Sequence, residues 1–495
     1  MNPENQQIIN FGDDEIIKKA SDYITFNHCC REYGKDGNII IERENWDEVK
    51  KSQEIDELID QDLNELKKKK KLDQFNDIDV YHMLQLNERE LVEEIRQMSE
   101  TPKMHLSIFQ GNIGNCYLIA TICAIAKFPD YIKQNIITIT KKRNNRIRFK
   151  FYIGGKEELV SSSSIVPAKM DRFKEIIYHF SYTSNDKNIY QVWEIAYSMR
   201  IGGFIESEDR DGYDSLFELT GYPVKEIPLK GHHMKEFRED SEDNNERINN
   251  EFDELCQLLS DKTITTSAVI STPYDTEIAV DNHHFPVNHC MTIIGTIKIG
   301  RIDYMIIRDQ ANVVSDSNTK ESIESKTKEL KEKFGMDEEE SSHCFLIKYQ
   351  SIKEHFHSIH YIRINEEFDK FTSYQNEIHL VNANSFFVEF RTKNKYFIII
   401  NPLEVHHSKK ERKAEGGETG KVDIKLTKTI RSQTEIQWTT STRFDFYNYL
   451  YSDEIDSTEE TTWKLELTYN GNQNVNYFKR YIRLSFRSIN DIEFN

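Results

Sequence analysis

The chain has 495 residues, which is enough for about three domains. Lys and Arg number 65 against 84 Asp and Glu, so the formal net charge is −19, and this acidity argues against nucleic acid or an anionic membrane as the main partner. Gly and Pro, at 19 and 9 residues, are too few for a collagen-like or proline-rich chain, whereas 28 Phe and 24 Tyr supply core material. The composition indicates a soluble, multidomain globular protein.

Residues 1 to about 100 are charged and have a helical pattern, with apolar residues at every third or fourth position. The run Lys67 to Lys71 is better explained as a solvated helix end than as a nuclear-import or acidic-surface patch. The first residues lack the basic and apolar regions of a signal peptide, and no stretch reaches about 18 apolar residues. We therefore expect a cytoplasmic protein with an N-terminal extension of unassigned role.

The segment that follows, from about residue 101, predicts mixed helix and strand. Residues 116–126 have the length and the small apolar side chains of a buried helix, and residues 188–203 predict a second helix that ends at Gly202 and Gly203. Residues 288–310 predict two strands joined by a tight turn at Gly300 and Arg301. From about residue 370 the pattern is all β, with apolar runs of strand length between turn residues, which is typical of a sandwich.

Seven cysteines stand at irregular spacing with no CxxC pair, so neither a zinc ribbon nor a redox dithiol is indicated. Cys116 differs from the rest because glycines and amides precede it and a helix is predicted to start there. The positive end of that helix favours a thiolate. Gln110 could donate a side-chain N–H to a developing oxyanion, together with the Cys116 backbone N–H. The other interpretation, a small buried hydrophobic residue, fits Cys123.

The segment Gln110-Gly-Asn-Ile-Gly-Asn-Cys116-Tyr-Leu-Ile-Ala resembles the nucleophile motif Q-G-x-x-G-x-C-[WY]-L-[LI]-A of the calpain family of papain-like cysteine proteases. The resemblance implies that Cys116 is the nucleophile. It also implies a distant histidine base and a third residue that orients it. Trp193-Glu-Ile-Ala-Tyr197 and a segment ending at Gly221 are similar to further family stretches in the same order.

His289 is the expected base, because His-Cys-Met-Thr-Ile-Ile-Gly295 resembles the family's G-H-A-[YF]-[ST]-[IV]-x-G. Asn288 replaces the first glycine of that pattern and Cys290 replaces the alanine. The neighbouring His283 and His284 are rivals whose Asp, Phe and Pro neighbours fit a loop better.

Asp309 is the expected orienting residue, although the family pattern here is R-N-P-W-G. Arg308 matches, Asp309 occupies the Asn position, and Ala311 stands where the family has a shielding Trp. An aspartate can accept from the imidazole N–H and would raise the pKa of the histidine. We expect the lost Trp to let water in and the substitution Asp309→Asn to retain activity. Asn312 is the alternative orienting residue.

Calcium binding is implied by the resemblance alone. Carboxylate and carbonyl oxygens would be the ligands, but Ser107 stands where the family has an acidic ligand, so no metal residues are assigned. The spacing of His355, His357 and His360 does not favour zinc. No organic cofactor is expected.

The predicted fold is α+β: a two-lobed papain-like cysteine protease core followed by an all-β C2-like sandwich. The expected parts are an extension over 1–100, a core over 101–365 and the sandwich over 370–495, and the core has a helical lobe over about 101–225 and a β-rich lobe over about 260–365. The expected function is an intracellular, calcium-dependent cysteine endopeptidase that cleaves proteins through Cys116, His289, Asp309 and Gln110.

Two other functions stay open. One is a catalytically impaired pseudo-protease that acts as a protein- or membrane-binding module, with membrane contact through the C-terminal sandwich. The departures at Asp309 and Ala311 are its support. The other is a papain-fold transferase such as a transglutaminase, against which the motif around Cys116 argues.

Overall fold

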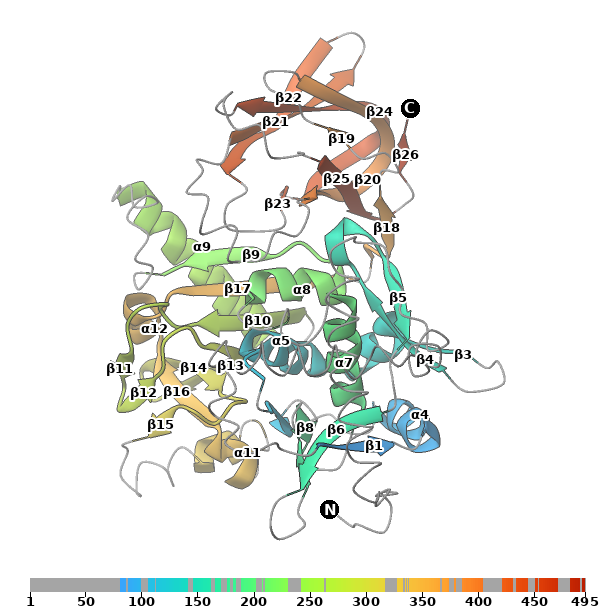
Figure 1. Cartoon of the computed structure of the whole chain (residues 1–495). Coiled ribbons are helices and arrows are strands. Elements are labelled where there is room, and N and C mark those ends of the chain that lie inside the picture. Colours follow the sequence, from blue (N-terminus) through green and yellow to red (C-terminus); the bar gives the residue numbers. More distant parts are fainter. Residues whose placement is uncertain are drawn as a thin grey trace. The chain divides into compact units, whose positions relative to one another are not determined.

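The computed structural model describes most residues between 81 and 494, and its longest gaps are at 230–241, 317–326, 404–420 and 471–480 (Figure 1). The predicted N-terminal helices before residue 81 lie outside the described residues. By their contacts the residues form two compact units. The first comprises Met1–Lys150, Leu159–Gly212 and Glu226–Tyr361, and the second comprises Phe151–Glu158, Tyr213–Lys225 and Ile362–Asn495. The three-part division expected from the sequence stays a prediction.

A six-stranded sheet runs through the first unit in the order β16, β14, β13, β10, β17, β9. Its strands are β9 Lys225–Pro228, β10 Thr265–Ser271, β13 Cys290–Ile299, β14 Ile302–Arg308, β16 Cys344–Lys348 and β17 Ser358–Ile364. The predicted hairpin of β13 and β14 is confirmed, and Gly300 takes a φ of 62° in its turn, a conformation that glycine adopts without strain.

The β13–β14 hairpin decides where two predicted site residues lie. The strands are antiparallel and Thr292 is paired with Arg308. The beginning of β13 and the end of β14 therefore lie side by side, at the same end of the two strands. His289 directly precedes β13 and Asp309 directly follows β14. Residues that are 20 positions apart in the chain are therefore neighbours.

Helix α5, Cys116–Ala126, is apolar on all sides and buried from Tyr117 onward, as expected for a helix in the middle of a core. It packs against β10 and β13 (Figure 1). Side chains of these strands also hold it, because Thr292 Oγ1 donates to Ala120 O at 2.9 Å and Ser267 Oγ donates to Ala124 O at 3.0 Å. The predicted helix is confirmed, and its middle is anchored to β10 and to β13, the strand that directly follows His289.

Helix α7, Ile189–Arg200, confirms the second predicted helix, although Gly202 and Gly203 lie outside the described residues. Its N-terminus is capped from a distance. The Glu94 carboxylate of helix α4, Glu88–Gln97, accepts the backbone N–H groups of Asn188 and Ile189 at 2.9 and 3.0 Å. A carboxylate at this position stabilises both the unpaired N–H groups and the helix dipole.

The smaller elements of the first unit follow, together with η5, the last residue of β4 and the first residue of β5, which belong to the second unit. The strands are β1 Tyr81–Gln85, β2 Ile108–Phe109, β3 Ile137–Thr140, β4 Arg146–Phe151, β5 Glu158–Ser161, β6 Ile165–Met170, β7 Ile176–Tyr178, β8 Tyr182–Thr183, β11 Ile278–Val280, β12 His283–Phe285 and β15 Ser315–Asp316. The helices are α6 Pro129–Tyr131, η4 Ile132–Ile136, η5 Ile153–Gly155, α9 Glu242–Ser260, α11 Glu338–Ser342 and α12 Tyr349–His355.

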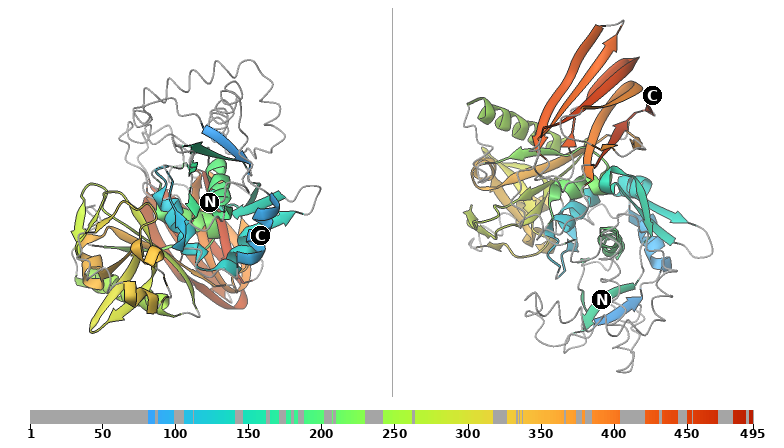
Figure 2. Two further views of the ribbon diagram at one scale, coloured as in Figure 1. Left: turned by 90° about the horizontal axis from the view of Figure 1, so that it is seen from below. Right: turned by 45° about the horizontal axis from the view of Figure 1, so that its top comes forward.

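The second unit contains a nine-stranded sheet whose long strands lie side by side (Figure 2). Its strands are β18 Lys370–Ser373, β19 Ile378–His379, β20 Ser385–Leu403, β21 Lys421–Ile430, β22 Gln433–Arg443, β23 Leu450–Tyr451, β24 Ile455–Asn470, β25 Tyr481–Ser488 and β26 Glu493–Phe494. Every described element from Lys370 onward is a strand, so the predicted all-β segment is confirmed. Buried aromatic and aliphatic residues such as Phe390, Trp463 and Phe486 form its core.

Two segments from earlier in the chain belong to this second unit. Helix α8, Gly212–Thr220, contributes Phe217, and η5 itself contacts β20 and β25. Arg487 on β25 donates to Tyr152 Oη at 3.3 Å and lies over the ring of Tyr222. None of the helices in the described part of the chain is both long and apolar enough to span a bilayer.

Candidate active site

Cys116 is the first residue of α5 and follows the N-cap residue Asn115. The first backbone N–H groups of a helix have no partner within the helix, and its positive dipole end favours an anion. Among the five cysteines in the described part of the chain, Cys116 alone is partly exposed. Burial raises the pKa of Cys123 to about 11 and that of Cys256 to about 12, so those two side chains remain thiols at neutral pH.

A buried carboxylate on α7 fixes the loop before the nucleophile. Asn115 Nδ2 donates to Glu194 Oε1 at 2.7 Å, and the backbone N–H of Ser181 donates to Glu194 Oε2 at 2.7 Å. Glu194 is fully buried. Burial raises its pKa, and the hydrogen bonds from Ser181 and Asn115 oppose that rise. The segment Trp193–Tyr197, which resembles a family stretch, therefore supplies the carboxylate that holds Asn115 in place.

His289 is held by backbone pairing beyond the end of the β10–β13 ladder. Its N–H donates to Thr272 Oγ1 at 2.9 Å, and its carbonyl accepts the N–H of Thr272 at 2.9 Å. The preceding Asn288 has a φ of 50°, a left-handed conformation that asparagine tolerates better than other non-glycine residues. This explains why Asn stands where the family pattern has Gly.

The imidazole of His289 and the carboxylate of Asp309 form a buried pair. His289 Nε2 lies 2.8 Å from Asp309 Oδ1, and the exposed fractions of the two residues are 6% and 1%. Burial lowers the pKa of His289, but hydrogen bonds with Asp309 and Cys116 more than compensate and raise it to about 10. Since Nε2 is occupied by Asp309, Nδ1 is the ring nitrogen left for the Cys116 thiol.

Asp309 binds more than the histidine. Its Oδ1 also accepts the N–H of Ala311 at 2.9 Å, and its Oδ2 accepts those of Val313 and Val314 at 2.7 and 2.8 Å. Burial raises the pKa of Asp309, yet the His289 contact and these N–H groups lower it to about 2. Both oxygens thus work only as acceptors, a role that an asparagine amide fills on one side alone.

Two sequence expectations around Asp309 change with this geometry. The pair is almost completely buried although Ala311 stands in the Trp position, so the expectation that water would enter is wrong for this structure. The backbone N–H groups gathered by Asp309 also argue against the expectation that Asp309→Asn retains activity. Asn312 is exposed and has a φ of 53°, and Asp309, not Asn312, contacts the His289 ring.

Gln110 is fixed on both its main chain and its side chain. Its N–H donates to Gln310 O at 2.8 Å, and its Nε2 donates to Ile113 O at 2.6 Å. A carboxamide nitrogen has two N–H bonds. Anchoring the first to Ile113 gives the second a defined direction, which is what an oxyanion donor needs.

Gln310 is a site residue that the sequence reasoning missed. It is 1% exposed, and its Nε2 lies 3.2 Å from Cys116 O and 2.9 Å from Cys290 O. It therefore ties the start of α5 to the beginning of β13. Only its position next to Asp309, where the family pattern has a proline without side-chain donors, could have drawn attention to it.

The remaining histidine candidates have other surroundings. His283, on β12, is buried against the rings of Phe285 and Phe345, and His284 on the same strand is exposed. Within the residues that the structure describes, no three His, Cys, Asp or Glu side chains gather so that they could hold a metal ion. Ser107, at the expected calcium position, is buried. Backbone carbonyl oxygens also bind calcium, so calcium binding stays a prediction that rests on the resemblance.

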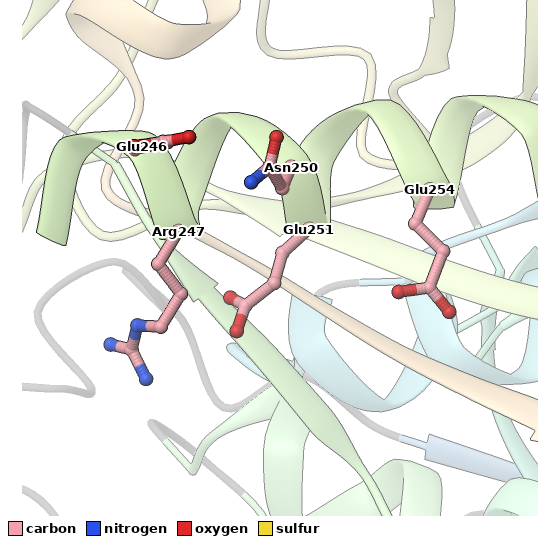
Figure 3. A pocket seen from close by; sticks show the side chains of 5 residues that line it. All are labelled: Glu246, Arg247, Asn250, Glu251 and Glu254. Atoms are coloured by element: carbon pink, nitrogen blue, oxygen red, sulfur yellow. The ribbon is translucent and has the colours of Figure 1, made fainter. Parts of the chain in front are cut away.

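A surface pocket is lined by residues of α9 only: Glu246, Arg247, Asn250, Glu251 and Glu254 (Figure 3). Arg247 and Glu251 extend to the same side of the helix in this view. Their spacing of four residues places them on one face of the helix. This pocket includes none of the residues described above.

A thiol at a helix N-terminus, an imidazole beside it and a buried carboxylate behind the imidazole are the parts of a thiol hydrolase. The model of the calpain family cysteine proteases matches residues 87–363, more than half of the chain. The chain therefore belongs to the calpain family of cysteine proteases, as the resemblance implied, and the match begins within the segment that the sequence left unassigned. A comparison with curated proteins gave no match.

Proposed function

We propose that this protein is a cysteine endopeptidase that cleaves proteins by a Cys116–His289–Asp309 mechanism. The observation that carries the proposal is the buried 2.8 Å contact between His289 Nε2 and Asp309, together with the partial exposure of Cys116 at the start of α5. The family supports peptide hydrolysis as the reaction.

His289 holds the proton of the Cys116 thiol as an imidazolium, and the first chemical step is attack of the resulting thiolate on the scissile carbonyl. The raised pKa of His289, about 10, keeps the imidazolium charged at neutral pH, and Asp309 holds the ring in one tautomer and orientation. The negative charge on the carbonyl oxygen is stabilised by the backbone N–H of Cys116 and by Gln110 Nε2.

His289 then donates its proton to the leaving amine, and a thioester to Cys116 is formed. Water, deprotonated by His289, hydrolyses that thioester and restores the thiol. Gln310 and Glu194 do not touch the substrate in this scheme. They position the loop and the helix start that carry Cys116.

Calcium dependence is a separate part of the proposal that rests on the family alone, and no step of the mechanism passes through calcium. Cytoplasmic location and a C2-like role for the sheet of 370–495, including contact with membranes, are likewise proposals. Contact of that sheet with phospholipid vesicles, measured by co-sedimentation, would support the C2-like role.

The test is cleavage of casein by the wild type and by Cys116→Ala, each with calcium and with a chelator. We expect cleavage by the wild type only, and loss of cleavage on chelation would support calcium dependence. Equal cleavage by both proteins would contradict the mechanism. Binding of casein by a wild type that never cleaves it would favour the pseudo-protease, and amine incorporation into casein without cleavage would favour a transglutaminase.

A further inference from the structure

Cys290 is the position at which the strand after the catalytic histidine departs from the family pattern, because it replaces an alanine. It is the first residue of β13 and is 5% exposed. The proposed mechanism does not use its thiol. The position of that thiol relative to Cys116 therefore decides whether Cys290 is more than a core residue.

Helix α5 lies along β13 and runs in the same direction. Thr292 Oγ1 donates to Ala120 O, whereas Ser267 Oγ donates to Ala124 O. Ser267 lies on β10 directly before the partner of Ile293, and β10 is antiparallel to β13. A later residue of α5 therefore contacts the sheet at a later position of β13.

This arrangement places Cys116 opposite Cys290. Cys116 is one turn before Ala120, about 6 Å back along the helix axis. Cys290 is two residues before Thr292, about 6.6 Å back along the strand. Alternate residues of a strand point to the same face, so Cys290 faces α5 as Thr292 does, at the level of the first residue of the helix.

Gln310 gives independent evidence that the two residues are close. Its Nε2 donates to Cys116 O at 3.2 Å and to Cys290 O at 2.9 Å, so both main chains lie within hydrogen-bond reach of one nitrogen atom. Burial raises the pKa of the Cys290 thiol, and the charge of Cys116 raises it further, which agrees with this proximity. Close packing of this kind is what a disulfide between two elements requires.

The two thiols differ in reactivity. Cys116 is partly exposed, at a helix N-terminus that favours a thiolate, whereas Cys290 is buried and remains a thiol. A peroxide from solvent therefore oxidises Cys116 first, and the sulfenic acid that forms condenses with a neighbouring thiol. Cys123, the other cysteine of α5, is two turns further on, about 10 Å along the helix axis.

We infer that Cys290 is a resolving cysteine, which converts a Cys116 oxidised by a hydroperoxide into a Cys116–Cys290 disulfide. In the first step the Cys116 thiolate attacks one oxygen of hydrogen peroxide, the O–O bond breaks, and hydroxide leaves a Cys116 sulfenic acid. In the second step the Cys290 sulfur attacks the sulfenic sulfur and the S–O bond breaks. The Cys290 proton leaves with the hydroxyl group as water, so two thiols are oxidised and one peroxide is reduced.

The disulfide blocks the nucleophile and protects it from irreversible oxidation. A sulfenic acid that meets no thiol is oxidised further to sulfinic and sulfonic acids, which thiol reductants do not reverse. The consequence for cleavage rests on the proposed function, whereas the disulfide itself does not. If Cys290 only fills the space beside Gly212, where an added Cβ would lie 3.3 Å from its Sγ, no disulfide forms.

The direct test treats the full-length protein with hydrogen peroxide, alkylates the remaining thiols and maps the digest by mass spectrometry without reductant. We expect the peptide that contains Cys116 to be linked to the peptide that contains Cys290, and the link to disappear after dithiothreitol. Conversion of Cys116 to a sulfinic or sulfonic acid while Cys290 stays alkylatable would overturn the inference. Pairing of Cys116 with any other cysteine would overturn it as well.

The variant Cys290→Ala installs the residue of the family pattern and should cleave casein as the wild type does. After peroxide and then dithiothreitol, we expect the wild type to regain most of its cleavage and Cys290→Ala to regain less than about a tenth. Cys256→Ala, which removes a cysteine of α9, is the control and should recover like the wild type. Equal recovery of the wild type and Cys290→Ala would overturn the inference. A disulfide in a wild type that never cleaves casein would refute the proposed function and leave the modification site standing.

Discussion

Replacement of Asp309 by asparagine tests the role of its carboxylate most sharply, because the change keeps the size of the side chain. Asp309 Oδ1 accepts hydrogen bonds from His289 and Ala311, and Oδ2 accepts them from Val313 and Val314. An asparagine that keeps its carbonyl toward His289 turns its NH₂ group toward two backbone N–H donors. The opposite rotamer faces the His289 N–H with a donor instead. Either orientation breaks two of four contacts.

The cost follows from the structure in two ways. Each buried N–H left without an acceptor costs about 1–3 kcal/mol, and two of them are affected. Independently, the fall in the pKa of Asp309 from 3.8 to about 2 corresponds to roughly 2 kcal/mol of native-state stabilisation at neutral pH. We expect Asp309→Asn to lose about 2–4 kcal/mol of stability and to lower kcat/KM by roughly 10²-fold or more, because an asparagine that satisfies Val313 and Val314 turns its NH₂ group toward His289 and no longer holds the imidazole in the correct tautomer.

The assay is thermal unfolding together with kcat/KM on a casein-derived peptide, measured at a temperature where each variant is folded. Asp303→Asn is the matched control, since this aspartate lies on β14, the strand that directly precedes Asp309, but its side chain is 46% exposed and pairs with the exposed Lys298. Its stability should change by less than about 0.5 kcal/mol. If Asp309→Asn matched the wild type in both measurements, neither oxygen of Asp309 would have the role given to it here.

Three further predictions concern neighbouring residues. Because contacts with Asp309 and Cys116 raise the pKa of His289 from 6.5 to about 10, kcat/KM should hold through neutral pH and fall as pH rises through about 10. The stabilisation that the His289–Asp309 pair gives the folded protein is complete below pH 6.5 and is lost as pH rises from there through about 10. A fall of kcat/KM with its midpoint near pH 7 would contradict this prediction. Gln110→Ala should lower kcat by roughly 10²–10³-fold with little change in KM, and an unchanged kcat would remove Gln110 from the oxyanion site. Asn288→Ala should lose about 1–2 kcal/mol in thermal unfolding because of its positive φ, whereas Asn288→Gly should be tolerated; equal loss in both would show that the Asn side chain matters instead.

Much of the arrangement could be predicted from sequence because it depends on local patterns. The all-apolar run after Cys116 indicated a buried helix, and the strand pair around Gly300 indicated a hairpin, and both are present. A hairpin of these two strands places His289 and Asp309 next to each other, at the same end of the strands. The family was indicated by the motif at Cys116 and is shown by the family model.

The contacts that could not be predicted join residues with no fixed spacing. Glu194 reaches Asn115 over 79 positions, and Gln310 reaches Cys116 over 194. Nothing in a sequence states which buried amide will meet which carbonyl, since that depends on how α5 and α7 pack. The burial of the His289–Asp309 pair was mispredicted for a similar reason. Loss of one covering side chain at Ala311 does not determine whether other groups exclude water.

The most direct test of the account is covalent labelling of the folded wild type by a peptide epoxide that reacts with activated thiolates, followed by mass spectrometry of its fragments. We predict a single label on Cys116, strongly reduced labelling in His289→Ala and an unlabelled Cys123 until the protein is denatured. Labelling of Cys116 that is equally fast in wild type and His289→Ala, or absent in the folded protein but present after denaturation, would contradict the proposed mechanism.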